Sequence, residues 1–453
     1  MPPDSAMISE VASMDASTLK DSDTHAIEYT AQAISPLVKG EVKMAIGDKG
    51  LMVTALFAAV EITFAEINSL DLTDYVITVK ADSGDYSFSR MGNWCTPFYD
   101  ALVDAYNMAV LRSLFIKSGP ILTAKGDVTL ADGSVKHAIP IRVFDNNVTA
   151  LPPDLTVKRV PLCFVNGMNK GDYSLTLYLD TGDGYTFSKL GYETAPFAAA
   201  VEKQIRALRE ETLMAVKEID PALTTVQASQ IAGLMPRGAA APIGQLAGIA
   251  PSFVAALESK IAATRAAEYY NAFKGLCDPS QIWVGFRKNE ATSGDETGNQ
   301  SALPGGLGGV IGGISALSEA SGVVLDGLPG AGDGATEPES VDPYRLWLIA
   351  PSKDGQFAAV EFIEPDSATF VYRTRGDFTA FAKNLNRALE AIDFKREVIR
   401  LTDEELQKPE NADYYMAAKR TAALQLVRSC FCGRVIHSSP ENWKRKLSEL
   451  WQG

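Results

Sequence analysis

The stretch DYVITVKADSGDYSFSRMGNWCTPF, residues 74–98, is followed later in the chain by a close copy, DYSLTLYLDTGDGYTFSKLGYETAPF, residues 172–197. The two segments keep the same spacing apart from one inserted residue, Gly184. Because self-similarity at a fixed spacing marks a repeated structural unit, the sequence predicts an internal duplication. The identical pairs are Asp74/Asp172, Tyr75/Tyr173, Asp82/Asp180, Gly84/Gly182, Tyr86/Tyr185, Phe88/Phe187, Gly92/Gly191, Pro97/Pro196 and Phe98/Phe197.

Each copy predicts two strands joined by a tight turn. In the first copy Tyr75, Ile77 and Val79 alternate with other residues, which is the period of a strand with one buried face, and the second copy repeats this phase. Asp-Ser-Gly-Asp at 82–85 and Asp-Thr-Gly-Asp-Gly at 180–184 have turn composition, because Asp and Gly tolerate the backbone angles of a tight hairpin. The alternation then resumes and ends at Gly92 and Gly191.

An amphipathic helix is expected after each hairpin. Pro97 and Pro196 suit the first turn of a helix, where an amide hydrogen would have no partner, and Thr96 is the expected N-cap of the first helix. Apolar residues at helical spacing then predict one inward-facing stripe in each copy. The stripes are Phe98, Leu102, Tyr106 and Ala109 in the first copy and Phe197, Val201, Ile205 and Leu208 in the second.

Weaker similarity extends the repeat towards the N-terminus. Residues 41–70 contain strand-like runs around an Asp-Lys-Gly turn, and residues 140–168 contain similar runs around Asp-Asn-Asn. Asn68 and Asn166 occupy matching places before a short turn. Each unit is therefore expected to be a string of short antiparallel strands followed by one helix.

A third, degenerate copy is predicted in residues 276–396. Its expected elements are a strand at 281–286, strand runs around an Asp354-Gly355 turn, and a helix after Gly376. Residues 291–341 interrupt this copy and are dominated by Gly, Ser, Ala and acidic residues, which cannot offset their ordering entropy by burial, so a flexible insertion is expected. The predicted helical stripe is Phe381, Leu385, Leu389 and Ile392.

The full chain divides into segments of different composition. We expect a disordered N-terminus at 1–24, the two repeats at 25–117 and 118–218, an alanine-rich helical linker at 219–275, the third copy and a helical tail at 397–453. Thr402-Asp-Glu-Glu405 is a capping box, and Ser439-Pro440 starts a last helix. The expected fold class is α+β, with tandem antiparallel β-sandwich units each followed by a helix.

Composition excludes several classes of function. The chain has 453 residues and a formal net charge of −14, which repels phosphate backbones and anionic headgroups, so nucleic acid is not an expected partner. Five scattered cysteines do not make a disulfide framework. The first residues do not form a secretory signal, and no apolar run approaches the ~20 residues needed to span a bilayer. A cytoplasmic location is the expectation.

The pattern of short antiparallel strands, a D-G-x-Y-x-F hairpin, a glycine and one amphipathic helix resembles the pleckstrin-homology-like superfamily, including its GRAM-type and bacterial members. The resemblance covers residues 25–115 and 125–217 and, more loosely, 280–396. It implies a bent seven-stranded sandwich whose open end is closed by the C-terminal helix. It also implies a binding module for phosphoinositides, peptides or other proteins that is seldom catalytic.

The sequence departs from the lipid-binding members of that superfamily. They carry several cations around the first hairpin, where phosphates are held. Here the first copy has Lys39, Lys43 and Lys49, interspersed with two acids, and the second copy has only Arg142 beside Asp145. A phosphate pocket needs convergent positive charge, so inositide binding is not the preferred interpretation.

Histidines and cysteines do not form a recognisable catalytic or metal-binding pattern. His25, His137 and His437 have no partner at metal-ligand spacing, and each is interpreted as structural or surface. Cys430 and Cys432 with His437 supply at most three metal ligands and are interpreted as incidental thiols. Cys95, at a helix N-terminus, could have a lowered thiol pKa, but the second copy has no equivalent thiol.

Other tempting motifs have simpler interpretations. The pairs Asp82/Asp85 and Asp180/Asp183 are interpreted as turn residues rather than a cation site, because no calcium-loop pattern is present. The glycines at 305–313 lack a Gly-Lys-Ser/Thr ending and are assigned to the flexible insertion. Residues 230–257 are apolar but lack a basic face and are expected to be buried rather than membrane-bound. The basic run 444–446 is interpreted as a solvated helix face.

The sequence therefore predicts a cytoplasmic, non-catalytic protein-binding or scaffold protein made of PH-like modules. Sheet edges, or the groove beside each helix, are the expected contact surfaces. The alternative is a membrane-peripheral adaptor that binds anionic lipid weakly through repeated units. No catalytic, cofactor-binding or metal-binding residue is assigned, no cofactor is expected, and the protein partner is not identified.

Overall fold

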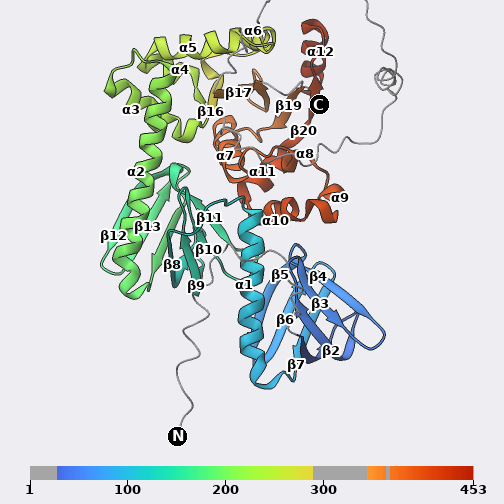
Figure 1. The fold of residues 1–453 in the computed structure, drawn as a ribbon. Coiled ribbons are helices and arrows are strands. Elements are labelled where there is room, and N and C mark those ends of the chain that lie inside the picture. The colour runs from blue at the N-terminus through green and yellow to red at the C-terminus, as the bar shows by residue number, and fades with distance from the viewer. Residues whose placement is uncertain (1–27, 289–343, 364–367, 452–453) are drawn as a thin grey trace, which may run out of the picture. The chain divides into compact units, whose positions relative to one another are not determined.

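Three antiparallel sheets and the helices between them make up the described part of the chain (Figure 1). The structure is a computed structural model and describes residues 28–288, 344–363 and 368–451. Its fold class is α+β, as predicted. The described residues up to Phe286 and from Leu346 onward belong to one compact unit. The predicted N-terminus at 1–24 and the predicted insertion at 291–341 lie outside the described residues.

The first repeat forms a seven-stranded antiparallel sheet. Its strand order is β4-β3-β2-β1-β7-β6-β5, so the first strand pairs with the last, and Gln32 lies opposite Ser89. Ile77 and Val79 are fully buried, as the period-two pattern predicts. The strands are β1 (Tyr29–Ile34), β2 (Lys39–Ile46), β3 (Gly50–Thr54), β4 (Ala59–Thr63), β5 (Ile67–Thr73), β6 (Val76–Ala81) and β7 (Gly84–Ser89).

The second repeat has the same topology, β11-β10-β9-β8-β14-β13-β12. The equivalence includes a β-bulge, because the register shifts at the matching residues Asn68 and Asn166. The predicted duplication is therefore confirmed in strand order and in a local irregularity. The strands are β8 (Leu122–Thr129), β9 (Val135–Val143), β10 (Asn147–Ala150), β11 (Lys158–Pro161), β12 (Val165–Gly171), β13 (Ser174–Leu179) and β14 (Gly184–Ser188), with the 3₁₀ helix η2 (Leu162–Phe164) before β12.

One helix follows each sheet, α1 (Cys95–Ser113) and α2 (Thr194–Ile219). The predicted stripes are buried in both helices and belong to the apolar cores of the sheets that precede them. The expected N-cap role of Thr96 is wrong. The short 3₁₀ helices η1 (Gly92–Trp94) and η3 (Gly191–Glu193) lead directly into α1 and α2, so Trp94 and Glu193 occupy the N-cap positions without a side-chain cap.

The predicted inward phase also fails at its first residue. Asp74 and Tyr75 form the turn between β5 and β6, with φ angles of 51° and 58°. A two-residue hairpin loop with positive φ at both positions matches the twist of the flanking strands. Tyr75 is consequently 73% exposed, and Tyr173 at the equivalent turn is 78% exposed. The buried phase begins at the next apolar position of each strand.

The linker is helical, as predicted, and its prolines mark the breaks. Pro251 lies in the first turn of a helix, Pro236 begins a 3₁₀ helix, and Pro242 lies in a two-residue strand. The elements are α3 (Thr225–Leu234), η4 (Pro236–Gly238), β15 (Ala241–Pro242), α4 (Ile243–Ile249), α5 (Pro251–Ala262), α6 (Ala267–Leu276) and η5 (Pro279–Gln281).

The third sheet has six strands in the order β15-β16-β17-β18-β19-β20. Gly285 allows close packing here, because a Cβ at that position would lie 2.3 Å from the Trp347 ring. The strand order differs from that of the two repeats, and the third PH-like copy stays a prediction. The remaining strands are β16 (Trp283–Lys288), β17 (Tyr344–Pro351), β18 (Phe357–Ile363), β19 (Ala368–Arg373) and β20 (Phe431–Ile436).

The tail is helical except for β20, which extends the third sheet. The predicted stripe of the third helix is buried, the Thr402 capping box is present, and Ser439 caps the last helix. The helices are α7 (Phe378–Ala391), α8 (Glu397–Arg400), α9 (Asp403–Leu406), η6 (Pro409–Asn411), α10 (Ala412–Arg420), α11 (Ala422–Cys430) and α12 (Pro440–Leu450).

Candidate functional site

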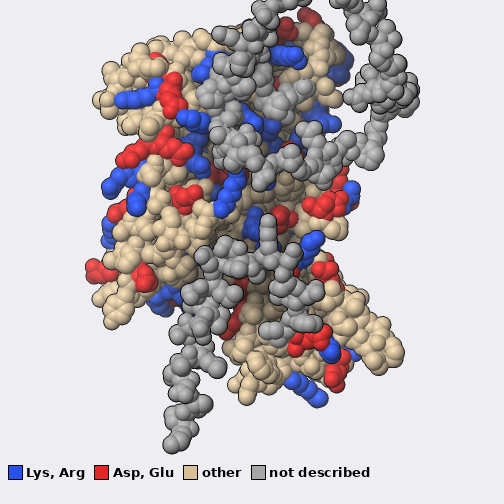
Figure 2. Space-filling view, viewed as in Figure 1, with Lys and Arg blue, Asp and Glu red and all other residues tan. Residues whose placement is uncertain are grey.

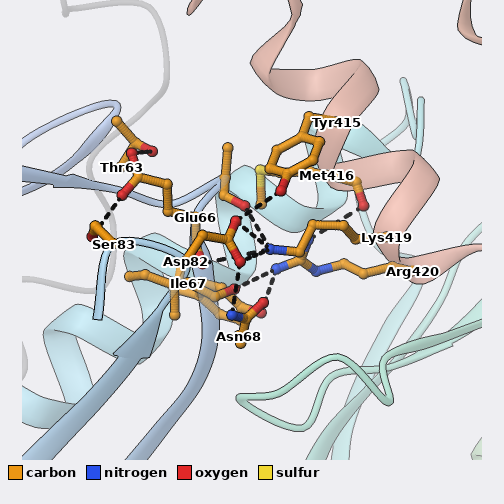
Figure 3. Close-up of polar contacts among 12 residues, drawn as sticks. Thr63, Glu66, Ile67, Asn68, Asp82, Ser83, Tyr415, Met416, Lys419 and Arg420 are labelled. Carbon is orange, nitrogen blue, oxygen red and sulfur yellow. Dashed lines mark hydrogen bonds and ion pairs between the residues drawn. The ribbon is translucent and has the colours of Figure 1, made fainter. Parts of the chain in front are cut away.

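The repeated aspartate of the first hairpin, Asp82, contacts helix α10 (Figure 3). The Lys419 Nζ lies 2.9 Å from its Oδ2 and 3.1 Å from its Oδ1. The Tyr415 hydroxyl donates to Oδ2 at 2.8 Å, and the side-chain amide of Asn68 donates to Oδ1 at 2.9 Å. A residue predicted only as part of a turn therefore also joins the first repeat to the tail.

Burial and hydrogen bonding act in opposite directions on this carboxylate. Burial alone would raise the pKa of Asp82, but the donors Asn68, Lys419 and Tyr415 together lower it below its ordinary value. The pKa of Lys419 is also lowered, because burial of its ammonium outweighs the attraction of the carboxylate. Burial and the bond to Asp82 raise the pKa of Tyr415 to about 12. The contact is therefore an ionised pair that carries a desolvation cost at its lysine end.

Arg420 reaches deeper into the same junction. Its side chain donates to the Ile67 carbonyl oxygen at 2.9 Å and to the Tyr106 hydroxyl at 2.8 Å, and the residue is only 5% exposed. Figure 3 shows Lys419 and Arg420 pointing together from α10 towards β5 and the hairpin turn. Tail and repeat are therefore joined by adjacent cations of one helix.

The second repeat uses its matching aspartate in the same way. The Arg387 guanidinium, from α7, donates to Asp180 Oδ1 at 2.8 Å and to Asp183 Oδ2 at 3.0 Å. The Lys383 ammonium donates to the Asp180 carbonyl oxygen at 3.3 Å. Each repeat thus presents the carboxylate of its β-hairpin turn to a cation from the C-terminal part of the chain.

A more deeply buried ion pair lies at the edge of the second sheet. Arg159, on β11, pairs with Glu390, on α7, and their side chains are 7% and 8% exposed. The Arg159 guanidinium donates to Glu390 Oε1 at 2.8 Å and also bonds Oε2, while Arg237 Nη1 lies 3.7 Å from Oε1. Helix α7 therefore covers the β11 edge of the second sheet.

The β5 edge of the first sheet is covered by the second repeat. The Leu70 amide donates to the Pro153 carbonyl oxygen at 2.8 Å, and Ser69 forms an isolated antiparallel bridge with Asp154. Both partners lie in the β10–β11 connection of the second repeat. Leu151 and Val157, from the same connection, are buried in the core of the first repeat. One of the sheet edges that the sequence predicts as a contact surface, β5, is thus occupied internally.

Of the outer strands of the two repeat sheets, β4 and β12 make no contact within the described ranges like those of β5 and β11. Edge strands present unpaired backbone groups, and proteins protect them with bulges and irregular residues. β12 is protected in this way, because it contains a bulge and the glycines Gly167 and Gly171. β4 pairs regularly with β3 over its whole length and has only one charged residue, Glu61. β4 is therefore the better edge for a partner strand.

Exposed apolar side chains lie beside β4. Leu56 and Phe57, in the β3–β4 turn, are 86% and 94% exposed, and Leu37, in the β1–β2 turn, is 56% exposed. The strand registers place both turns at the same end of the sheet, because Gly40 pairs with Ala33 and Lys43 with Thr54. We call Leu37, Leu56 and Phe57 the apolar tip.

A cavity of about 1070 Å³ lies at the other end of β4. Phe64 and Met416 contribute apolar walls, and Glu61, Glu410 and Asp413 are among the acidic lining residues. Six carboxylates line the cavity against three cationic side chains. The cavity is therefore suited to apolar and positively charged groups.

The two histidines in the described ranges, His137 and His437, each contact a carboxylate. His25 lies outside the described residues. His137 has a 69% exposed side chain, and its Nδ1 lies 2.9 Å from Asp127. The His437 Nε2 lies 3.0 Å from the buried carboxylate of Glu361, and its ring stacks on Tyr269 at 3.9 Å between centroids. The contacts of His437 with Glu361 and Tyr269 hold the segment that follows β20 against the rest of the fold.

The cysteines that the sequence singles out, Cys95, Cys430 and Cys432, are buried or partly buried. Burial raises the pKa of the Cys95 thiol, which is the opposite of the lowering that a helix N-terminus could produce. Cys430 is buried, and the Cys432 thiol donates to its carbonyl oxygen at 3.5 Å. Within the described ranges, no three His, Cys, Asp or Glu side chains are grouped to hold a metal ion.

The basic candidates do not converge. Lys43 pairs with Glu28, Lys49 lines the cavity, and Arg142 donates to the Met108 sulfur at 3.8 Å. In the 444–446 run, Arg445 pairs with Glu449. On the face drawn in Figure 2, cationic and anionic side chains are interspersed. The glycines at 305–313 lie outside the described residues.

Sequence reasoning missed the partners of the repeated aspartates and the apolar tip. Lys419 lies 337 positions from Asp82, and no local pattern connects them. Leu56 and Phe57 stand between alanines without Gly, Asn or Pro, so this segment has no turn signal. The one sequence feature that could have indicated the apolar tip is the pair of adjacent large apolar residues between two predicted strands.

Comparisons with known proteins do not identify the chain. A scan against models of protein families and a search of curated protein sequences both find no match. No helix among the described residues is long and apolar enough to cross a membrane.

Proposed function

We propose that this protein is a non-catalytic scaffold built from pleckstrin-homology-like units, which binds protein partners through the apolar tip and the β4 edge of its first repeat. Seven antiparallel strands followed by a helix with a buried stripe are what the resemblance implies for each unit. In this proposal the helix closes the open end of the sandwich.

The observation that carries the proposal is the exposure of Leu56 and Phe57, at 86% and 94%. Burying one such side chain contributes about 1.5–3 kcal/mol, so leaving both in water forgoes a favourable contact. Contiguous exposed apolar patches are typical of contact surfaces, and Leu56 and Phe57 are adjacent in the chain.

The second repeat supports this interpretation of the first. Its β10–β11 connection is equivalent to the β3–β4 turn, and it uses Leu151 and Val157 to pack on the neighbouring repeat. This end of the unit therefore already serves as a docking end within the chain. In the first repeat the same end carries Leu56 and Phe57 and has no neighbour within the described ranges.

The decisive test compares baits that differ only at the tip. The full-length chain, Leu56→Ser/Phe57→Ser and Tyr173→Ser/Tyr192→Ser would be used to capture proteins from native extract, with identification by mass spectrometry. Tyr173 and Tyr192 are 78% and 102% exposed on the second repeat, so the second double variant removes equally exposed rings elsewhere. We expect a reproducible partner that the wild type and the tyrosine variant retain and the tip variant loses.

The same three proteins distinguish the alternative function. Flotation with anionic vesicles is expected to leave all three in the unbound fraction, because the net charge is −14. Flotation of the wild type that is lost in the tip variant would favour the membrane-peripheral adaptor. Identical protein sets from all three baits would refute the tip as the binding surface.

A further inference from the structure

We propose that the partner segment is an extended peptide with an apolar residue at one end and lysine or arginine residues at the other, paired along β4 of the first repeat. The inference rests on the proposed function and adds the chemistry of the partner. Three features support it. The apolar tip lies at one end of β4, the unpaired backbone edge runs along this strand within the described ranges, and the acidic cavity lies at its other end.

The backbone of β4 is available for pairing. The Phe64 amide donates to the Lys49 carbonyl oxygen, towards β3. Because the direction of hydrogen bonding alternates along an antiparallel strand, Ile62 faces β3 as well, whereas Ala59 and Glu61 direct their amide and carbonyl groups outward. No backbone hydrogen bond within the described ranges uses these outward groups of Ala59 and Glu61. They can accept a partner strand without breaking an existing bond.

The ends of β4 differ in chemistry. The strand starts directly after Leu56 and Phe57, and it ends at Thr63, which lines the cavity together with Phe64. Five residues of strand span roughly 17 Å. A partner segment of about eight residues would therefore reach from the apolar tip to the cavity.

The charge of the cavity selects the basic end of the segment. Glu61, Glu410 and Asp413 have no ion-pair partner within the described ranges, and none of them donates or accepts a side-chain hydrogen bond there. A cation placed among these carboxylates would gain attraction from several groups at once. Phosphate groups would be repelled, which separates this surface from an inositide or nucleic-acid site.

A second copy of this chain does not fit the surface as well. The docking end of the second repeat shares the apolar core of the first repeat with α1, whose Val110 and Leu111 are buried. The equivalent positions of α2 are Arg209 and Glu210. A second copy would therefore offer a charged helix face to the apolar tip, so a different protein is the expected partner.

The test uses synthetic probes and the full-length chain. Fluorescein-labelled eight-residue peptides would carry leucine at one end, alternating valine and threonine in the middle, and two lysines at the other end, made in both directions. Matched probes replace the lysines with glutamates or place proline in the middle. Fluorescence anisotropy should show at least about tenfold weaker binding of the glutamate and proline probes.

Two variants locate the binding surface, and a third is the control. Ala59→Pro removes one outward amide and no internal bond, and Glu410→Lys/Asp413→Lys reverses the charge of the cavity. Each should weaken binding of the lysine probe at least about tenfold. Glu210→Lys/Glu211→Lys makes the same charge change at exposed positions of α2 and should leave binding unchanged. Melting temperatures of all variants would establish that they fold.

The outcomes are distinct. Equal binding of lysine and glutamate probes, or lysine-probe binding that both Ala59→Pro and Glu410→Lys/Asp413→Lys retain, would overturn the proposed chemistry. If the tip variant still loses its captured partner in that case, the scaffold function stands with a different kind of segment. If neither probe binding nor partner capture depends on the first repeat, both proposals fail.

Discussion

The buried pair between Arg159 and Glu390 gives the sharpest test of how the second repeat is held. Replacing Glu390 with glutamine keeps the shape of the side chain but leaves the Arg159 guanidinium, with a side chain only 7% exposed, without its anion. Arg237, 3.7 Å from the same carboxylate, also loses its partner. Breaking a buried pair on one side typically costs about 3–5 kcal/mol, so a loss of that size is expected for the contact between β11 and α7.

Hydrogen exchange followed by mass spectrometry is the appropriate assay, because a chain with several sheets need not unfold in one step. The opening free energy of peptides from β11 and α7 would be compared between wild type and Glu390→Gln. The control is Arg445→Gln, which breaks an ion pair whose side chains are 61% and 59% exposed and should cost less than about 1 kcal/mol.

The double variant Arg159→Met/Glu390→Met separates the cost of an unpaired charge from the loss of contact. Because both charges are removed together, it should be more stable than Glu390→Gln alone. A loss of less than about 1 kcal/mol in the opening free energy for Glu390→Gln would refute the reasoning, since a buried guanidinium without its anion should cost more than that. A double variant less stable than the single one would show that packing, not charge, dominates the contact.

Three further predictions follow from the junctions and the core. The pKa of Asp82 is lowered in the folded chain, so the ionised carboxylate stabilises the fold at pH values above the pKa of the unfolded carboxyl. This stabilisation is lost as the pH falls through the pKa of the folded state. The urea midpoints of wild type and Asp82→Asn should therefore differ at pH 7 and converge below about pH 4. Burial raises the pKa of the Cys95 thiol, and it raises the pKa of the Cys277 thiol to about 11. Both thiols should therefore react with a thiol reagent at pH 8 far more slowly in the native protein than in the unfolded protein. Rapid labelling of either thiol in the native protein would contradict its burial. Gly285→Ala should lower the free energy of unfolding by about 1–3 kcal/mol in thermal unfolding, because the new Cβ would lie 2.3 Å from the Trp347 ring. The control is Gly275→Ala, which adds a Cβ to a helix position with open space around it and should be neutral or stabilising.

Features set by neighbouring residues could be predicted from the sequence. Periodicity predicted the strands and the buried stripes of the helices, and turn chemistry predicted the hairpin turns, and the structure has these elements in the two repeats. The two errors are also local. Thr96 was expected to cap a helix, but Gly92, with φ of 57°, lets the chain enter a 3₁₀ turn that makes a side-chain cap unnecessary. Tyr75 was expected to face inward, but the two-residue turn requires it outside the strand.

The junctions could not be predicted from the sequence, because they join distant residues. Glu390 pairs with Arg159 across 231 positions, and Lys419 pairs with Asp82 across 337. Neither pair carries a periodic or compositional signal. The candidate site is difficult for the same reason, since Glu410 and Asp413 reach the cavity only because α10 packs on the first repeat.

Within the described ranges, the two repeats use their hairpin turns alike and their β3–β4 and β10–β11 connections differently. Asp82 and Asp180 occupy matching turns, and each takes a cation from the C-terminal part of the chain, so that part of the unit is used alike in both copies. The opposite holds for the docking end. In the second repeat, Leu151 and Val157 are buried in the core that also contains α1, whereas Leu56 and Phe57 of the first repeat are exposed, and α2 has Arg209 where α1 has Val110. Among the described residues, duplication thus gives one such end that completes the fold and one whose apolar side chains stay exposed, and the proposed partner segment would run from that exposed end along β4 to the acidic cavity.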